Sequence, residues 1–244
     1  MLLAERAEVV GLREDGALHF VTWDRATGAV TVVGVPDAAA IRQAVQARRL
    51  QYEGVLCQEE SAGHVARALP GWRREAAILH LQVDSSRLPA LEPMGPGGMH
   101  MRPFYSPQAL PVPGDRVDED VVIRFLSSDE VENVKAPEDL KRELTLAVLL
   151  GRVAATVVGK EPVSFCYAGP VTESLWDVSI DTLEERRRRG YASLCVAFMV
   201  DHMHREGKRP VWGAAESNAA SLGLARRLGF GEVDRVVLFE ESAP

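Results

Sequence analysis

The chain has 244 residues, of which 46% are hydrophobic and 26% are charged, and its formal net charge is −7 at pH 7. These values indicate a globular protein with one large domain or two small ones. The negative charge argues against a general electrostatic attraction to nucleic acid and suits a cationic or amine substrate.

The three cysteines, Cys57, Cys166 and Cys195, are far apart and odd in number. This usage favours reduced thiols over a disulfide framework or a zinc site. No apolar run has the length of a membrane span, and the first residues do not resemble a secretory signal. We therefore expect a cytoplasmic protein that binds no metal and no membrane.

The first half of the chain alternates between strand and helix patterns. Strands are predicted at 7–12, 17–23, 29–35, 55–57 and 76–83, and helices at 37–48 and 59–69. Asp37 is a predicted N-cap, and Pro70-Gly71 ends the second helix.

Residues 85–118 are rich in proline and glycine, so they cannot sustain a helix or a central strand. The segment is either a linker or a loop over a cleft. Its large apolar residues, Met94, Met99, Met101, Phe104 and Tyr105, favour the loop. They either line a substrate entrance or pack between the halves, and packing is the more common role of such residues.

The second half gives a longer series of elements. Strands are predicted at 121–125, 153–158, 163–168, 174–182, 211–212 and 233–239, and helices after Ser127, at 138–151, 191–206 and 218–228. The chemical centre lies between the fourth strand and the third helix. Trp176, Val178 and Ile180 alternate with polar residues up to that junction, and a helical pattern begins at Tyr191.

The junction reads Arg187-Arg188-Arg189-Gly190-Tyr191-Ala192. Glycine permits a tight turn and a close approach of the backbone to a ligand. The first amides of a helix lack partners within the helix and can hold an anion. The neighbouring arginines add donors that suit phosphate. Together they predict a pyrophosphate-binding loop.

This junction resembles motif A of the GNAT superfamily of acyl-CoA-dependent N-acyltransferases, in which Arg187, Gly190 and Ala192 hold the motif positions. Glu216 to Ser221, followed by Leu228-Gly229-Phe230, is similar to the next helix of that family. An ordinary α/β unit with a basic helix start is the alternative.

The resemblance implies an α/β (α+β) GNAT fold, a mixed central sheet flanked by helices. We expect an N-terminal α/β half at 1–84, a connecting segment at 85–118 and a GNAT catalytic domain at 119–244. The end of the first half resembles the end of the chain. Both have a strand, a Glu-Ser pair, a helix, a short turn and a further strand, with Glu60-Ser61 and Leu69-Pro70-Gly71-Trp72 in the first half. The first half is therefore either a smaller, degenerate GNAT-like half without a cofactor or a chance similarity.

The resemblance also implies acetyl-CoA as acyl donor. The pantetheine arm would pair with the backbone of Ile180, Asp181 and Thr182. The pyrophosphate would take amides from Arg188, Arg189, Gly190, Tyr191 and Ala192, with Arg187 at the mouth. Asn218 and Ser221 would face the pantetheine, although Asn218 fits a plain helix N-cap nearly as well.

The sequence departs from the family at the catalytic positions. Ala225 holds the usual tyrosine position, and the usual acidic position falls near Trp176. Asp177 and Asp181 lie on the opposite face of that strand, and Glu216 ends a later strand. We predict deprotonation through water, assisted by Asp177 or Glu216.

These inferences lead to an N-acetyltransferase for the amine of a small molecule, acting without nucleic acid or membrane, either as a monomer or as a homodimer. The missing tyrosine leaves open a non-catalytic acyl-CoA sensor or interaction module. A protein or peptide N-acetyltransferase is the third alternative.

Overall fold

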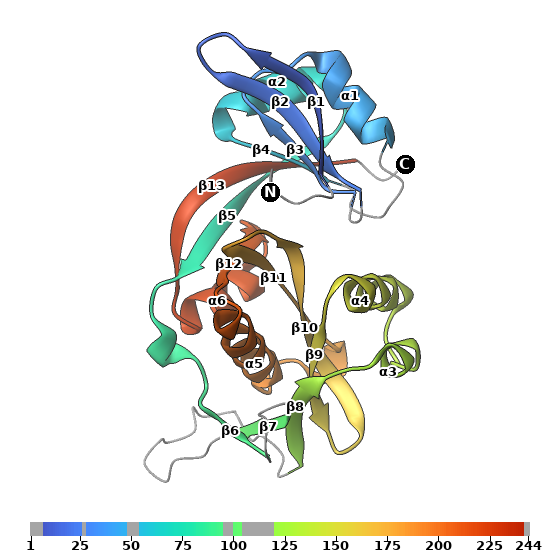
Figure 1. Cartoon of the computed structure of the whole chain (residues 1–244), viewed down its shortest axis with the longest axis vertical. Coiled ribbons are helices and arrows are strands. Elements are labelled where there is room, and N and C mark those ends of the chain that lie inside the picture. The colour runs from blue at the N-terminus through green and yellow to red at the C-terminus, as the bar shows by residue number, and fades with distance from the viewer. Residues whose placement is uncertain (1–6, 26–27, 48–53, 95–99, 104–119, 242–244) are drawn as a thin grey trace. The chain divides into compact units, whose positions relative to one another are not determined.

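A computed structural model describes residues 7–25, 28–47, 54–94, 100–103 and 120–241 (Figure 1). The chain forms two compact units. The first unit contains residues 1–80, 213–222 and 232–244, and the second contains 81–212 and 223–231. Because the chain returns to the first unit near its end, the units interleave along the sequence. The two units are therefore not the continuous segments 1–84 and 119–244. The division of the chain into those two segments stays a prediction.

The sheet of the first unit has the strand order β1-β2-β3-β4-β13-β5. Its elements are β1 (Ala7–Glu14), β2 (Leu18–Asp24), β3 (Val30–Val33), α1 (Ala38–Ala47), β4 (Gly54–Cys57), α2 (Glu59–Ala68), β5 (Arg73–Gln82) and β13 (Phe230–Glu240). Strand β5 ends in the second unit, and β13 begins there. Strands β1 to β3 are antiparallel, β3 and β4 are parallel, and β13 is antiparallel to β4. Helices α1 and α2 share one apolar core with these strands, in which Val21, Ile41 and Val65 are fully buried.

The second unit has the strand order β12-β11-β10-β9-β8-β7-β6. Its elements are β6 (Leu91–Pro93), β7 (His100–Pro103), β8 (Val121–Phe125), α3 (Ser128–Glu132), α4 (Glu138–Leu150), β9 (Val153–Val158), β10 (Glu161–Val171), β11 (Leu175–Thr182), α5 (Tyr191–Arg205), β12 (Arg209–Ala215) and α6 (Ala219–Arg227). Two short 3-10 turns, Ser85–Arg87 and Glu184–Arg186, complete it. Parts of β12 and α6 belong to the first unit.

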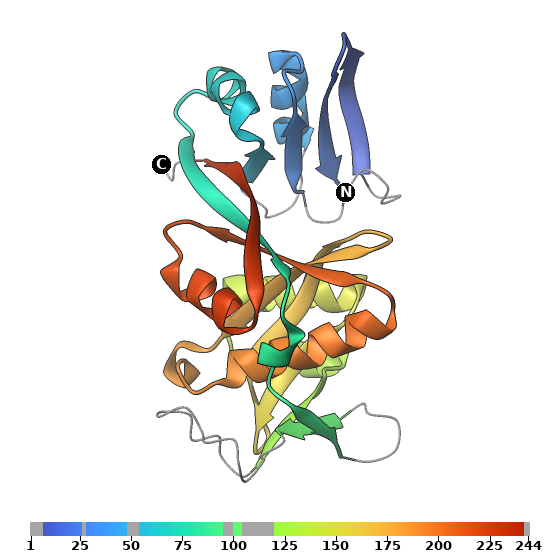
Figure 2. The same ribbon diagram turned by 90° about the vertical axis from the view of Figure 1, so that its left-hand side faces the viewer.

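Opposite faces of this sheet carry different helices. Helices α3 and α4 pack against one face, where Phe165 and Leu144 are fully buried. Helix α5 covers the other face, because the Thr156 hydroxyl donates to the Tyr191 carbonyl at 3.0 Å. Figure 1 shows β9 and β10 between α5 and α4, and Figure 2 looks onto the α5 side. Alternate residues of β11 therefore face α5 and the α3–α4 side.

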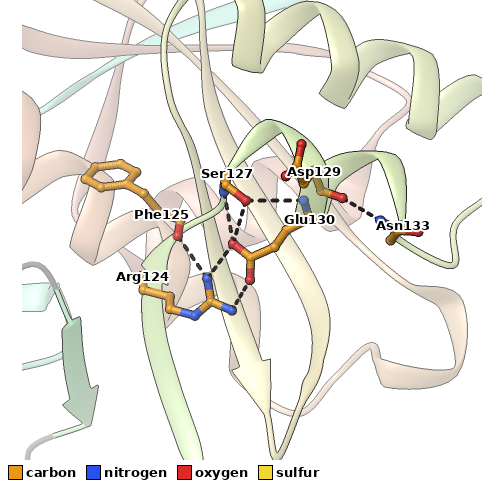
Figure 3. Close-up of polar contacts among 6 residues, drawn as sticks. All are labelled: Arg124, Phe125, Ser127, Asp129, Glu130 and Asn133. Atoms are coloured by element: carbon orange, nitrogen blue, oxygen red, sulfur yellow. Dashed lines mark hydrogen bonds and ion pairs between the residues drawn. The ribbon is translucent and has the colours of Figure 1, made fainter.

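The start of α3 is fixed to the end of β8 by a polar network (Figure 3). The Ser127 hydroxyl accepts from the Glu130 amide, and the Glu130 carboxylate accepts from the Ser127 amide, which is a capping box. Arg124 donates to both Glu130 oxygens, at 3.0 and 2.5 Å. Its hydrogen bonds are the main reason that the pKa of Glu130 falls to about 2. These hydrogen bonds tie the start of α3 to the end of β8.

The two halves repeat the same order of elements. The series β1-β2-β3-α1-β4-α2-β5 matches β9-β10-β11-α5-β12-α6-β13. In both series three antiparallel strands precede a helix that leads to a strand parallel to the third. The resemblance seen in the sequence therefore extends to the topology.

The proline-rich segment is partly built into the second unit. Strand β6 pairs with β7, and β7 pairs with β8, at one edge of the sheet. Edge strands tolerate proline because the backbone on their outer side makes no hydrogen bonds to a neighbouring strand. The expectation of a linker or a covering loop is therefore wrong for Leu91–Pro93 and His100–Pro103. Met101 is buried in this edge. Met99, Phe104 and Tyr105 lie outside the described residues.

Candidate functional site

Strands β11 and β12 run side by side only at their beginnings. Their parallel pairing covers Leu175 to Asp177 and Arg209 to Val211. Strand β11 continues to Thr182, paired with β10 on its other side. In the described pairings, residues 178–182 have no strand partner on the β12 side. Their backbone groups form an open edge to which an extended ligand with amide groups can bind.

The junction between β11 and α5 has an unusual backbone. Arg188 has a φ of 61° and is the only residue other than glycine with positive φ in the described part of the chain. Gly190, the N-cap of α5, has a φ of 80°. Left-handed residues cost free energy when they carry a side chain, and such conformations cluster at functional sites. Successive amides in turns of this kind form a concave anion site together with the helix start.

The arginines of the junction have different roles. Arg186 donates to Glu161 at 3.0 Å, so its charge is directed away from the turn. Arg187 donates to the Thr182 carbonyl at 3.1 Å and thereby ties the loop to the end of β11. Arg188 and Arg189 are exposed. The first turn of α5 has no acidic residue, so the helix start remains suited to an anion.

Ile180 and Thr182 point to the α5 face, in register with Cys166 and Ser164 of β10. The Thr182 hydroxyl bonds the Ser164 hydroxyl at 2.8 Å. Tyr191 opens α5 and is only 1% exposed, so it packs beneath the loop and does not project from it. Ala192, next to it, is half-buried. These residues set the position of the open edge and of the helix start.

Asp177 occupies the last paired position before the strands diverge. It faces away from Trp176, toward Gly169 in a bulge of β10. A β-carbon on Gly169 would lie 2.9 Å from the Asp177 Oδ2 atom, so glycine makes room for this carboxylate. Burial raises the pKa of Asp177 to about 6. Asp177 is therefore a carboxylate with the proton affinity of a general base near neutral pH.

Asp181 has partners that the sequence did not indicate. Its Oδ2 atom lies 3.3 Å from the Tyr167 hydroxyl, which lies 2.6 Å from Glu143 Oε2 on α4. Burial and the Glu143 charge raise the pKa of Asp181. Tyr167 and Glu143 were missed because only the β10–β11 register and the packing of α4 bring them to Asp181. No local pattern in the sequence signals this contact.

Three predicted site residues belong to the first unit. Glu216 is exposed and accepts from Arg235 at 3.0 Å, so its carboxylate is already paired. The Asn218 side chain accepts from the Ser221 amide at 3.0 Å, which makes Asn218 the N-cap of α6. The structure thus groups Asp177, residues 180–182 and the loop in the second unit, and Glu216, Asn218 and Ser221 in the first.

The loop and the open edge fit an acyl-CoA by their chemistry. A diphosphate matches the left-handed turn, the helix start and the exposed arginines. A pantetheine arm carries peptide-like amides that match the unpaired backbone of residues 178–182. Among the described residues, no group of three or more histidine, cysteine or acidic side chains can hold a metal ion.

Residues 150–239 match a family model described as GNAT acetyltransferase. This stretch runs from the end of α4 to β13 and includes the open edge and the loop. Residues 150–239 are therefore similar to a GNAT acetyltransferase region. The matched stretch includes Arg187, Gly190 and Ala192, where the sequence resembles the GNAT motif, and it supports an acyltransferase activity for this part of the chain.

Solved structures support the GNAT fold over the whole chain. A GCN5-related N-acetyltransferase-like protein from Streptococcus suis has a TM-score of 0.68 at 14% identity, covering 98% of this chain and 90% of that chain. A GNAT-family protein from Novosphingobium aromaticivorans has a TM-score of 0.57 at 15% identity, covering 96% and 92%. A tandem GNAT protein from the clavulanic acid biosynthesis pathway has a TM-score of 0.52 at 14% identity, covering 100% and 86%. No curated protein matches the sequence.

The repeated element order gives the chain two halves of similar topology, and one of the structures that share its fold is a tandem GNAT protein. The first half therefore repeats the element order of the second, and its assignment as a degenerate GNAT-like half stays a prediction. Helices of the described residues are too short or too polar to cross a membrane. Cys57, Cys166 and Cys195 are buried and form no disulfide.

Proposed function

We propose that this protein transfers the acetyl group of acetyl-CoA to the amine of a small molecule in the cytoplasm. The open edge of β11 beside the glycine–arginine junction is the observation that carries the proposal. An acyl-CoA needs both features, because one end is a polyphosphate and the other is an extended amide chain.

In this proposal the chain binds the donor with backbone more than with side chains. The edge at Ile180 to Thr182 takes the pantetheine, and the amides of Arg188 to Ala192 take the pyrophosphate. Arg187 closes the mouth of the loop through its bond to Thr182. Acetyl-CoA contributes the activated acyl group and a good leaving thiolate.

Asp177 is the better of the two proposed bases. Its carboxylate is half-buried beside the open edge, whereas Glu216 is exposed and paired with Arg235. With a pKa raised to about 6, Asp177 is ionised at neutral pH and can accept a proton from the amine through a water molecule. Holding the amine next to the thioester also lowers the barrier by several kcal/mol, on the order of the effect of proximity.

The proposal needs no tyrosine acid. Ala225 is fully buried in α6 and has no proton to give. Coenzyme A thiolate is a comparatively stable leaving group, and solvent can protonate it. The acidic net charge and the carboxylates of β11 that face the α3–α4 side support an amine as the acceptor.

A thiol-release assay tests the proposal. Acetyl-CoA is mixed with a panel of small primary and aromatic amines and, in parallel, with lysine peptides and peptides bearing a free N-terminus. We expect release with at least one small amine, and none from a variant whose loop carries Gly190→Glu. Release with peptides alone would reject the small-molecule acceptor, and binding of acetyl-CoA without release would reject acetyl transfer.

A further inference from the structure

Tyr167 lies between two carboxylates, those of Glu143 and Asp181. It lies on β10 and is 7% exposed, and its hydroxyl is within hydrogen-bonding distance of both Glu143 and Asp181. Asp181 is half-buried at the end of the open edge, while Glu143 is exposed on α4. The three side chains therefore form a hydrogen-bonded series that begins at the open edge of β11, where the amine is proposed to bind, and ends at solvent.

The number of protons on these three side chains limits the hydrogen bonds that they can make. A phenol has one proton to donate, and an ionised carboxylate has none. Both hydrogen bonds can therefore be made at once only when one of the carboxyl groups is protonated. Either Asp181 donates to Tyr167 and Tyr167 to Glu143, or the direction is reversed. The two arrangements differ by the transfer of one proton from Asp181 to Glu143.

We propose that Asp181, Tyr167 and Glu143 form a proton path that carries the proton of the acceptor amine from the open edge of β11 to solvent. The inference rests on the proposed acetyl transfer and adds an outlet that neither the motif nor the family match supplies. Tyr167 and Glu143 act through Asp181 and are positioning residues.

Each step of the path balances. The acceptor enters as an ammonium group and gives one N–H proton to the Asp181 carboxylate, directly or through one water. The second proton, lost when the amine attacks the thioester, goes to Asp177. The Tyr167 proton then moves to Glu143 as the Asp181 proton moves to Tyr167. Glu143 releases its proton to solvent, which leaves Asp181 ionised for the next cycle. Burial raises the pKa of Tyr167 far above its ordinary value, so the phenol passes the proton by exchange and is not ionised on the way.

The groups around Asp181 determine how its titration responds to substitution. They are Tyr167 and Cys166 on β10, Glu143 and Asp139 on α4, and Arg187 in the loop. The Glu143 charge raises the pKa of Asp181, and the Tyr167 hydrogen bond lowers it. Glu143→Gln should therefore move the acidic limb of the pH–rate profile to lower pH, and Tyr167→Phe should move it to higher pH.

The test uses the full chain with acetyl-CoA and the best amine of the panel. Both variants are expected to lose about tenfold or more in kcat, at the lower end of general acid–base effects or just below it, while the KM for acetyl-CoA changes less than twofold. Added imidazole should restore part of the rate, because a mobile base replaces the missing path. Glu138→Gln, an exposed glutamate on the same helix, is the matched control and should behave as wild type.

If the wild type is active and both variants keep its kcat and the position of the acidic limb, the proton path is rejected. The acetyl-transfer proposal is unaffected by that result. A loss that imidazole does not restore, with both limbs in place, would make Tyr167 a packing residue. If Tyr167→Phe does not fold, Glu143→Gln decides by itself, because Glu143 is exposed. A wild type that is inactive with every amine rejects the acetyl-transfer proposal, and the proton path with it.

Discussion

The two units contain the same β-α-β junction in two chemical forms. In the second unit β11 extends beyond its pairing with the parallel strand β12, and the N-cap of α5, Gly190, has a left-handed backbone conformation. In the first unit β3 pairs with β4 from Val30 to Val32, which is nearly its whole length. Little of that strand is left as an open edge.

The helix starts differ as well. The Asp37 carboxylate accepts from the Ala39 amide at 2.8 Å, so α1 has its own anion at its N-terminus. Pro36 precedes it and has no amide proton. In α5 the same place has arginines and a glycine. We therefore expect unequal binding from equal topology, because the proposed acyl-CoA site uses an unpaired strand edge and a helix start that has no anion of its own.

The largest expected effect concerns the last paired position of each β-α-β unit, which is Asp177 in β11 and Val32 in β3. Asp177→Asn should lower kcat by about a hundredfold, the scale of general base catalysis, with little change in acetyl-CoA affinity. Steady-state kinetics and calorimetry measure the two quantities. A variant with wild-type kcat would remove Asp177 from the mechanism.

The same variant has a predicted effect on stability. Folding raises the pKa of Asp177 from 3.8 to about 6, so the native state disfavours the carboxylate. Wild-type stability is then lost as the pH rises from about 4 to about 6. Asp177→Asn should be more stable at pH 7, by at most about 3 kcal/mol before solvent screening, and about equal to wild type at pH 4. Urea titrations at both pH values would show this, and equal stability at pH 7 would contradict it.

Gly190→Glu would make the second junction resemble the first by placing a negative charge at the helix start. The affinity for coenzyme A should fall at least tenfold, or about 1.4 kcal/mol. Because Gly190 has positive φ, backbone strain needs a separate control. Gly207→Glu at the end of α5 introduces the same side chain at a φ of 76°, with no atom within 4 Å of the new β-carbon. It should lose stability but keep the affinity, and unchanged affinity in a folded Gly190→Glu protein would reject the loop assignment.

Asp37→Ala removes the anion from the first junction. We expect a loss of about 1 kcal/mol in unfolding free energy, the usual effect of an N-cap, and no change in coenzyme A affinity. Calorimetry should give one coenzyme A per chain for both proteins. A second bound molecule would show that the first unit retains a site.

Tyr191→Phe is expected to have the smallest effect. Tyr191 is the first residue of α5 and is almost fully buried, whereas α1 begins with Ala38. If its role is packing, turnover should change less than about threefold, far below the scale of acid–base catalysis. A loss of a hundredfold with intact fold and affinity would identify Tyr191 as the acid and contradict the proposal.

The sequence determined the elements and the loop. These features follow from local patterns in the sequence, which local backbone preferences turn into structure. The patterns are the alternation around Trp176 and Val178, the helical spacing after Tyr191 and the Arg187–Gly190 motif. The helices and the longer strands therefore appear close to their predicted positions. Strands β6 and β7 were missed because proline and glycine obscure short strands at a sheet edge. Strand β7 is held by pairing with β8, and β6 by pairing with β7.

Tertiary structure alone decided what surrounds the loop. The open edge exists because β11 and β12 part after Asp177, and the room for that carboxylate comes from a bulge at Gly169. Contacts from α4 and β10 give Asp181 its partners Tyr167 and Glu143. Such features depend on register and helix packing between distant residues, which no local pattern encodes. The sequence thus predicts where an anion binds, and packing brings together the groups of the proposed proton path.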